Sequence, residues 1–283
     1  GAEDRAEWGH GAAIALIAYL AAIALLPNIA IGWALALAAA AVLLALPKWY
    51  HLALSLLAIA AGWALPTVAL WSSTLTPALA GTPASTADLP GLASIANRIV
   101  PVALLAVLAG WRLDSQRREL RIFSGALAIA LLVIAAHVLF RQLFAFAQPD
   151  DFIARGLMER TLWQGLLLVA GFGLIYLATA RPLPWAVWTG RGLIALSLLH
   201  FAWFGFVLHN PLWDPQAVGS IPVANLLLPS YAIGALAAWV LGREVERAGI
   251  ARGRLAGDTV LMALALVFAL SSLRQAFAGS VLV

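Results

Sequence analysis

The stretch LPNIAIGWALALAAAAVLLALPK, Leu26 to Lys48, decides the fold class of this chain. Its middle, residues 29–46, carries no charged side chain and is bounded by Pro27 and Pro47. A helix of about 20 apolar residues crosses a hydrocarbon core of about 30 Å, and lipid offers no partners to unpaired backbone groups. Proline ends one helix and begins the next. The stretch therefore predicts a membrane-spanning helix between two tight connections.

The whole chain shares this character. Of its 283 residues 63% are hydrophobic and 11% are charged, and the mean hydropathy is +0.94, which is too apolar for a soluble domain. The apolar runs are continuous and lack the alternation of a membrane barrel. We predict an all-α polytopic bundle, one domain over 1–283, with about nine spans: 10–26, 29–46, 50–71, 97–112, 121–141, 157–179, 185–208, 223–241 and 257–276.

The basic residues predict the orientation, because Lys and Arg are retained on the cytoplasmic side. With a cytoplasmic N-terminus, twelve of the seventeen basic residues lie inside, mostly in WRLDSQRRELR (111–121) and GREVERAGIARGR (242–254). The outer loops then fall at about 72–98, 142–156 and 209–222. We expect a multi-pass protein of the bacterial cytoplasmic membrane. Its start at Gly1 suggests part of a longer protein.

Several classes of chemistry are not expected. The chain has no cysteine, which excludes disulfides and thiolate metal sites. Its net charge of +4 reflects membrane topology, so no nucleic-acid partner is expected. The histidines at 137, 200 and 209 fall on different elements, and the chain shows no phosphate-binding or dinucleotide glycine motif. We therefore expect no metal and no cofactor.

Polar residues gather near the predicted outer ends of the later spans. His137 and Arg141 lie four apart on one helical face, and Arg160 lies inside a span, where an arginine costs several kcal/mol unless it finds water or a partner. The candidate ligand-binding residues are His137, Arg141, Arg160, His209, Asn210, Asn225 and Arg274. For His137 and Arg141 the alternative is a packed histidine beside a snorkelling arginine.

The segment between the seventh and eighth spans contains a further signal. Asn225 stands four residues before Pro229, and proline frees the carbonyl four residues back in a helix. We expect an interrupted eighth helix there, a feature that marks binding sites in transporters. The middle of the segment, DPQAVGSIP (214–222), is expected to be only a connecting turn.

Three stretches carry a family resemblance: NPLWDPQAVGSIPVANLLLPSY (210–231), LSSLRQAFAG (270–279) and ERTLWQGLLLVAGFGLIYLATARP (159–182). Over roughly residues 100–283 the chain resembles a bacterial family of large predicted polytopic inner-membrane proteins, known only as a domain of unknown function. The family pattern matches Asn210, Pro211, Val218, Gly219 and Asn225, and its ending matches Arg274, Phe277 and Gly279. Its members are often longer. The resemblance implies no activity and no catalytic residue.

The candidate residues favour a transporter or flippase, or a transport subunit, which handles an anionic envelope lipid or a lipid-linked glycan in an outward-facing polar pocket. An acyl- or glycosyl-transferase is the first alternative, with His209 or His200 as base and Asp214 or Asp151 as an orienting acid. A scaffold subunit is the second. Membrane lipids are the expected partners, with a lipid-linked glycan and other envelope proteins as further candidates.

Overall fold

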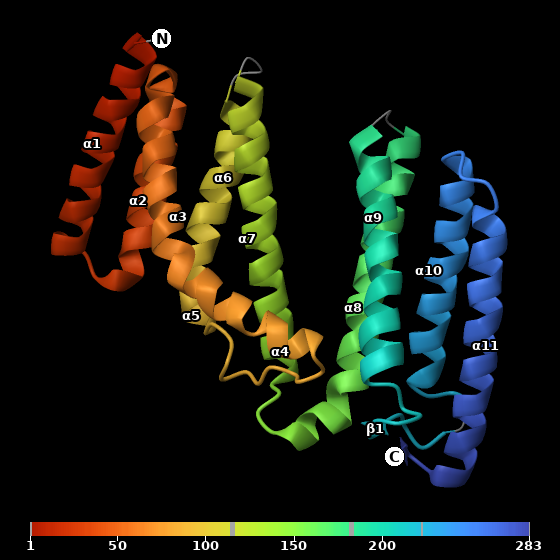
Figure 1. Ribbon diagram of the computed structural model, residues 1–283. Helices are drawn as coiled ribbons and strands as arrows, with labels where there is room; N and C mark the ends of the chain where they lie inside the picture. Colours follow the sequence, from red (N-terminus) through yellow and green to blue (C-terminus); the bar gives the residue numbers. More distant parts are fainter. Residues whose placement is uncertain (1, 114–116, 181–183, 222, 283) are drawn as a thin grey trace. The chain divides into compact units, whose positions relative to one another are not determined.

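The computed structural model describes residues 2–113, 117–180, 184–221 and 223–282. The chain divides into two compact units. Unit 1 comprises Gly1–Leu79 and Ala84–Ala145, and unit 2 comprises Ala80–Pro83 and Phe146–Val283. Each unit is a group of antiparallel helices (Figure 1).

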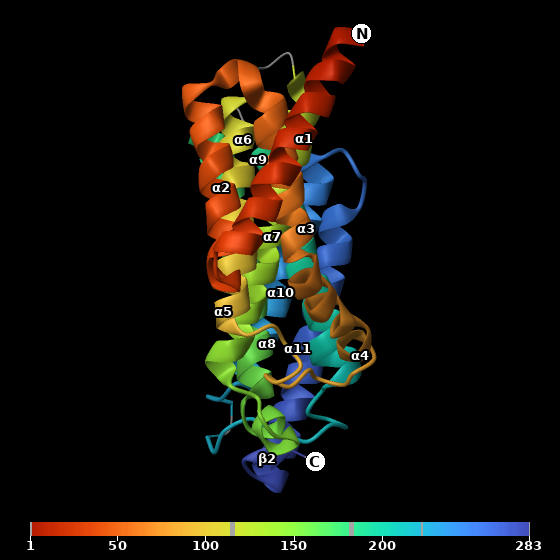
Figure 2. The same ribbon diagram turned by 90° about the vertical axis from the view of Figure 1, so that its left-hand side faces the viewer.

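Unit 1 is built on five long helices that run up and down (Figures 1 and 2). They are α1 (Ala2–Leu25), α2 (Asn28–Ala45), α3 (Tyr50–Ser73), α6 (Val100–Arg112) and α7 (Arg118–Phe144). Short elements join them: the 3-10 helix η1 (Pro47–Trp49), α4 (Leu75–Leu79), α5 (Leu92–Ser94) and the π-helix η2 (Ile95–Ile99). The predicted tight connection at Pro47 is confirmed, since the chain turns there through η1 within three residues.

Unit 2 has four long helical segments. They are α8 (Pro149–Ala180), α9 (Pro184–His200) with its π-helical continuation η4 (Phe201–Leu208), α10 (Leu227–Arg247) and α11 (Gly253–Ala278). A short antiparallel pair, β1 (Gln216–Ala217) and β2 (Val281–Leu282), ties the segment after η4 to the chain after α11. It lies at the end of unit 2 where α8 and α10 begin and α11 ends (Figures 1 and 2).

The all-α polytopic class is confirmed. Among the described residues, eight of the nine expected spans are helices long and apolar enough to cross a membrane. The remaining one corresponds to α10, a helix of 21 residues whose last turns carry Arg243, Glu244, Glu246 and Arg247 and are less apolar. Large apolar side chains lie exposed along the spans, such as Leu25 (81%) and Val169 (70%), as expected for helices that face lipid. The cytoplasmic N-terminus stays a prediction.

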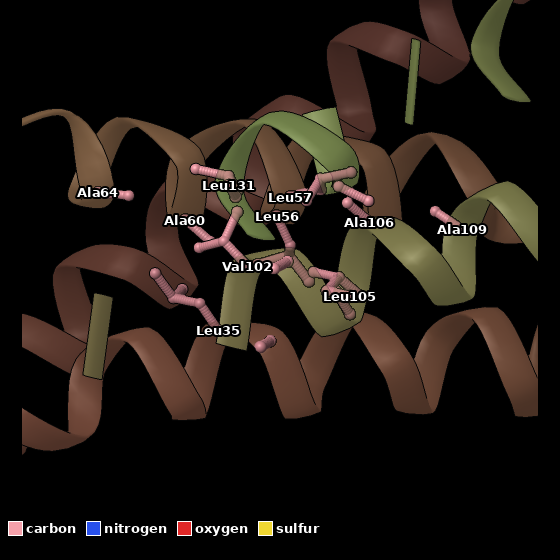
Figure 3. Packing of buried hydrophobic residues seen from close by; sticks show 14 of the residues in the cluster. Leu35, Leu56, Leu57, Ala60, Ala64, Val102, Leu105, Ala106, Ala109 and Leu131 are labelled. Atoms are coloured by element: carbon pink, nitrogen blue, oxygen red, sulfur yellow. The ribbon is translucent and has the colours of Figure 1, made fainter. Parts of the chain in front are cut away.

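In the described residues, the core of unit 1 is one apolar cluster from all five long helices, in which alanines alternate with leucines and isoleucines. Figure 3 shows its centre, where Leu56 and Leu57 of α3, Val102 and Leu105 of α6 and Leu131 of α7 meet. Alanines line α2, α3 and α6 and let the backbones approach closely. Gly32 of α2 marks the closest approach, since an added Cβ would stand 2.2 Å from the carbonyl oxygen of Asn97 in η2.

The eighth helix is not interrupted, so the expected break at Pro229 is wrong. The helix α10 begins only at Leu227, which places Pro229 in its first turn. Proline is tolerated there, because the first N–H groups of a helix have no intrahelical partner. Asn225 lies before the helix, where its Oδ1 accepts the Leu227 backbone N–H at 2.8 Å.

Candidate functional site

The candidate site of unit 2 is organised by the segment that joins η4 to α10, residues 209–226. This segment is polar and folded back on the helix ends. Its backbone is held by the β1–β2 pair, by Val218 N–H donating to the Ser280 carbonyl at 3.0 Å, and by Leu226 N–H donating to the Val218 carbonyl at 3.0 Å. The segment is therefore fixed at both ends and in its middle.

A chain of side-chain hydrogen bonds links α8 to this segment. Arg160 Nη2 donates to Gln216 Oε1 at 2.8 Å, and Gln216 Nε2 donates to Asp214 Oδ2 at 2.9 Å. The same Asp214 oxygen lies 2.9 Å from His209 Nδ1. Arg160 is only 5% exposed and Gln216 is fully buried. A buried guanidinium needs such partners, because an unsolvated charge is costly in a low dielectric.

Phe152 contacts both Arg160 and His209. The Arg160 guanidinium lies 5.0 Å from the centre of the Phe152 ring, and the His209 ring meets Phe152 edge-on at 4.8 Å between centroids. The ring face attracts the guanidinium charge and orients the imidazole. Arg160 and His209 are thus held close to one another on a single aromatic side chain of α8.

The electrostatics of His209 favour its neutral form. Burial lowers the pKa of the imidazole, and the Arg160 charge lowers it further, whereas the hydrogen bond and the charge of Asp214 act in the opposite direction. The net shift of the pKa is downward from 6.5. In the neutral form the contact with Asp214 places the proton on Nδ1 and leaves a lone pair on Nε2. That arrangement is the one a general base requires.

Asn210 and Arg274 act on the first turn after η4. Asn210 Oδ1 accepts the Leu212 backbone N–H at 2.9 Å, and its own carbonyl accepts the N–H groups of Trp213 and Asp214. From α11, Arg274 Nη1 donates to the Leu212 carbonyl. The turn that presents Asp214 to His209 is therefore supported by both predicted residues.

Asn225 and Gln275 form the second support. Asn225 Nδ2 donates to Gln275 Oε1 and to the Ile221 carbonyl, the latter at 3.1 Å. Gln275 Nε2 donates to the Gly219 carbonyl at 2.7 Å. Gln275 is 2% exposed. The end of the segment is thus bound to α11 by a pair of side-chain amides.

Three buried polar groups lie close together beneath this end of the unit. They are Asn210 Nδ2, Tyr231 Oη of α10 and Ser271 Oγ of α11. The Tyr231 hydroxyl is close to both Asn210 and Ser271. All three groups are able to donate a hydrogen bond. The two hydroxyls also accept hydrogen bonds, so the three groups can pair with one another or with a ligand.

His137 and Arg141 belong to unit 1, whereas the other five predicted residues belong to unit 2. His137 Nδ1 accepts a hydrogen bond from Trp71 Nε1 at 3.0 Å, and Arg141 Nη2 donates to the Ala84 carbonyl at 2.7 Å. The two side chains join α7 to α3 and to the loop after α4. The contact of His137 agrees with a packed histidine, but Arg141 is buried (8% exposed) and does not reach outward as a snorkelling arginine would. A role of the two residues in binding stays a prediction. The other five, Arg160, His209, Asn210, Asn225 and Arg274, meet at one end of unit 2.

Sequence reasoning missed Gln216, which lies in the stretch expected to be a plain turn. The Gln216 side chain accepts a hydrogen bond from Arg160 and donates one to Asp214, so the middle of the segment takes part in the network. Gln275, which follows the predicted Arg274, is a second member of the network outside the predicted ligand-binding residues. One sequence signal could have found both residues. Polar side chains are rare in this chain, so a glutamine near the end of a span is unusual. Among the described residues no three His, Cys, Asp or Glu side chains gather as a metal site.

The helices and their apolar surfaces define the class: this is a multi-pass integral membrane protein. The chain belongs to the family described as "Predicted membrane protein (DUF2339)", which matches residues 2–283. The family therefore extends well beyond the 100–283 region on which the resemblance rested. Neither the curated proteins nor the solved structures contain a match to this chain.

Proposed function

We propose that this protein moves an anionic envelope lipid, or the lipid part of a lipid-linked glycan, across the membrane, and that the polar end of unit 2 binds the head group. The observation that carries the proposal is the cluster of buried donors Asn210, Tyr231 and Ser271, which lies beside the segment that Arg160 and Arg274 hold. Phosphate and carboxylate oxygens accept hydrogen bonds from such donors, and these bonds are stronger when the acceptor is ionised.

Two arginines support this assignment. Arg160 and Arg274 come from α8 and α11 and reach the same folded-back segment. Asn210 links the buried donors to Arg274 through Leu212. The Leu212 backbone N–H donates to Asn210 Oδ1, and the Leu212 carbonyl accepts a hydrogen bond from the Arg274 guanidinium. Arginine suits a phosphate group by its planar fork of donors. The site therefore combines positive charge with neutral donors, as the binding of an anionic head group requires.

A transport assay tests the proposal. The chain is reconstituted in vesicles with fluorescent phosphatidylglycerol, and the rate of its movement between leaflets is compared with protein-free vesicles. Tyr231→Phe removes one hydroxyl and keeps the ring, so we expect about a tenfold slower rate, which corresponds to one lost hydrogen bond to a charged group. Arg274→Gln should have at least the same effect.

Matched controls use Tyr176→Phe, whose ring is 77% exposed, and Arg243→Gln near the other end of α10. These two variants should transport like the wild type. A wild-type rate equal to that of protein-free vesicles rejects transport of phospholipid. The same assay with a fluorescent polyprenyl phosphate then tests the carrier of a lipid-linked glycan.

The His209–Asp214 pair favours a second candidate, a membrane transferase in which His209 is the general base. Asp214 would orient the imidazole and stabilise its charged form, and the arginines would hold the lipid phosphate. Mass spectrometry of phosphatidylglycerol incubated with the protein tests this candidate. A modified lipid that forms with the wild type and not with His209→Gln supports transfer, whereas unmodified lipid with normal transport in His209→Gln rejects it.

A further inference from the structure

Unit 1 contains a groove that is lined by residues of its own helices. It runs between α6 and α7, has a volume of about 690 Å³, and is lined by Val107, Gly110, Arg118, Arg121, Ile122, Gly125, Ala128, Ile129 and Leu132. Seven of these nine residues are apolar or glycine, and the two arginines stand together at the beginning of α7. The groove thus has a charged mouth and an apolar length.

Two glycines form the floor of the groove. An added Cβ on Gly110 would stand 3.7 Å from the Gly125 backbone nitrogen, so the two helices approach closely there. An added Cβ on Gly125 meets nothing within 4 Å, which leaves the space above it open. The walls are apolar side chains that face outward, such as Ile122 (59% exposed) and Ile129 (66% exposed). In a membrane such walls face lipid chains.

The length and charge of the groove match one lipid molecule. From Arg118 to Leu132 the helix rises about 21 Å, which exceeds half of a hydrocarbon core of about 30 Å. The groove therefore reaches from the head-group level through the depth of one leaflet. Arg118 and Arg121, three residues apart, lie on one face, and Glu119 between them does not line the groove.

The surroundings add positive charge. A neighbouring cavity of about 270 Å³ in the same unit is lined by Lys48, Arg112 and Arg117 together with Leu43, Pro47, Tyr50 and Leu113. The Arg117 guanidinium rests 3.4 Å above the Tyr50 ring. In the sequence, residues 111–121 hold four arginines against two acidic residues. Basic clusters at a span end attract anionic lipids.

We infer that the α6–α7 groove binds an anionic phospholipid, with an acyl chain along Gly110 and Gly125 and the phosphate at Arg118 and Arg121. The site is separate from the polar end of unit 2 and does not rest on the proposed function. It binds lipid as a fixed component of unit 1, and transport need not follow from its occupancy.

Native mass spectrometry of the full chain in detergent tests the inference with dioleoyl phosphatidylglycerol and dioleoyl phosphatidylcholine as probes. The wild type should bind phosphatidylglycerol about tenfold more tightly than phosphatidylcholine. The double substitution Arg118→Gln with Arg121→Gln should weaken the binding of phosphatidylglycerol and leave the binding of phosphatidylcholine unchanged. Gly125→Leu should fill the groove and weaken the binding of both lipids, without a clash because the space above Gly125 is open.

Two matched controls keep the test specific. Arg252→Gln with Arg254→Gln removes the same charge at the beginning of α11, and Gly192→Leu places the same side chain at an open position of α9. Both should bind phosphatidylglycerol like the wild type. Wild-type binding by the groove variants overturns the inference. The inference is also overturned if the wild type is a dimer and Gly125→Leu dissociates it, because a second copy of the chain then occupies the groove.

Discussion

The two units of this protein differ in what they bury. Unit 1 is held by one continuous apolar cluster over five helices, whereas the apolar clusters of unit 2 are two small groups. Unit 2 instead buries many polar side chains, among them Arg160, Gln164, Asn210, Gln216 and Gln275. Lipid tails are as apolar as leucine, so helices in a membrane gain little from burying apolar side chains against one another. Close packing of small side chains is what holds such helices together, and unit 1 has this kind of core. Buried polar groups are costly, so their concentration in unit 2 points to a role beyond packing.

The largest expected effect is the loss of Gln216 from the network of unit 2. Gln216→Leu removes the acceptor of Arg160 and a donor to Asp214, and we expect a loss of about 3 kcal/mol in the free energy of unfolding, because a buried charge loses its partner. Denaturant unfolding of the full chain in micelles measures the loss, and hydrogen exchange locates it in unit 2. Gln148→Leu, at an exposed position, should change little. Equal stability of the two variants would show that the network is dispensable.

The apolar core of unit 1 should respond to a change of volume. Leu56 of α3 is 2% exposed, and Leu56→Ala should lower the free energy of unfolding by about 2 kcal/mol, because the cavity loses packing contacts. Leu65 on the same helix is 62% exposed, and Leu65→Ala should cost much less. The same unfolding experiment compares the two. A similar cost at both positions would contradict the assignment of the core to the Leu56 face.

A smaller effect is expected from acid in unit 2. The pKa of His209 in the folded protein lies below its usual 6.5, so the unfolded state takes up a proton that the folded state resists. The stability from neutral His209 is complete above pH 6.5 and is lost as the pH falls toward the folded-state pKa, at a rate of at most about 1.4 kcal/mol per pH unit. Unfolding measured between pH 8 and pH 5 should show this slope. His209→Gln should flatten it, and an unchanged slope would assign it to another group.

The sequence was sufficient for the fold class, because uninterrupted apolar runs leave a helix as the natural way to satisfy the backbone in lipid. The span between Pro27 and Pro47 is the clearest example, since α2 occupies Asn28–Ala45. The eighth span was harder to place. Pro229 was read as a break inside a helix, but α10 starts two residues before it, and a proline signal does not distinguish a first turn from an interior.

The candidate site was predictable only in part. Five polar residues near span ends, Arg160, His209, Asn210, Asn225 and Arg274, meet in unit 2 because the ends of neighbouring helices are brought together by any antiparallel bundle. The pairing of β1 with β2 places Gln216 inward, and such a contact over 60 or more residues leaves no local pattern. The packing of His137 against Trp71 is equally invisible, because an i,i+4 spacing with Arg141 fits a site and a helix contact alike.

The smallest effect should come from an ion pair outside the buried network. Arg243 Nη1 lies 3.2 Å from Asp258 Oδ1, but the two side chains are 24% and 44% exposed, and such a pair contributes roughly 0–1 kcal/mol. Asp258→Asn should therefore change the free energy of unfolding within about 0.5 kcal/mol. Glu244 offers the matched case, because its side chain is only 6% exposed. Its Oε2 accepts hydrogen bonds from Arg191 Nε and Nη2, each at 3.2 Å. Glu244→Gln should cost clearly more in the same experiment, since it removes the buried carboxylate charge that faces the Arg191 and Arg247 guanidinium groups. If both substitutions cost the same, burial does not determine the weight of polar contacts in unit 2, and the contrast with unit 1 loses its physical basis.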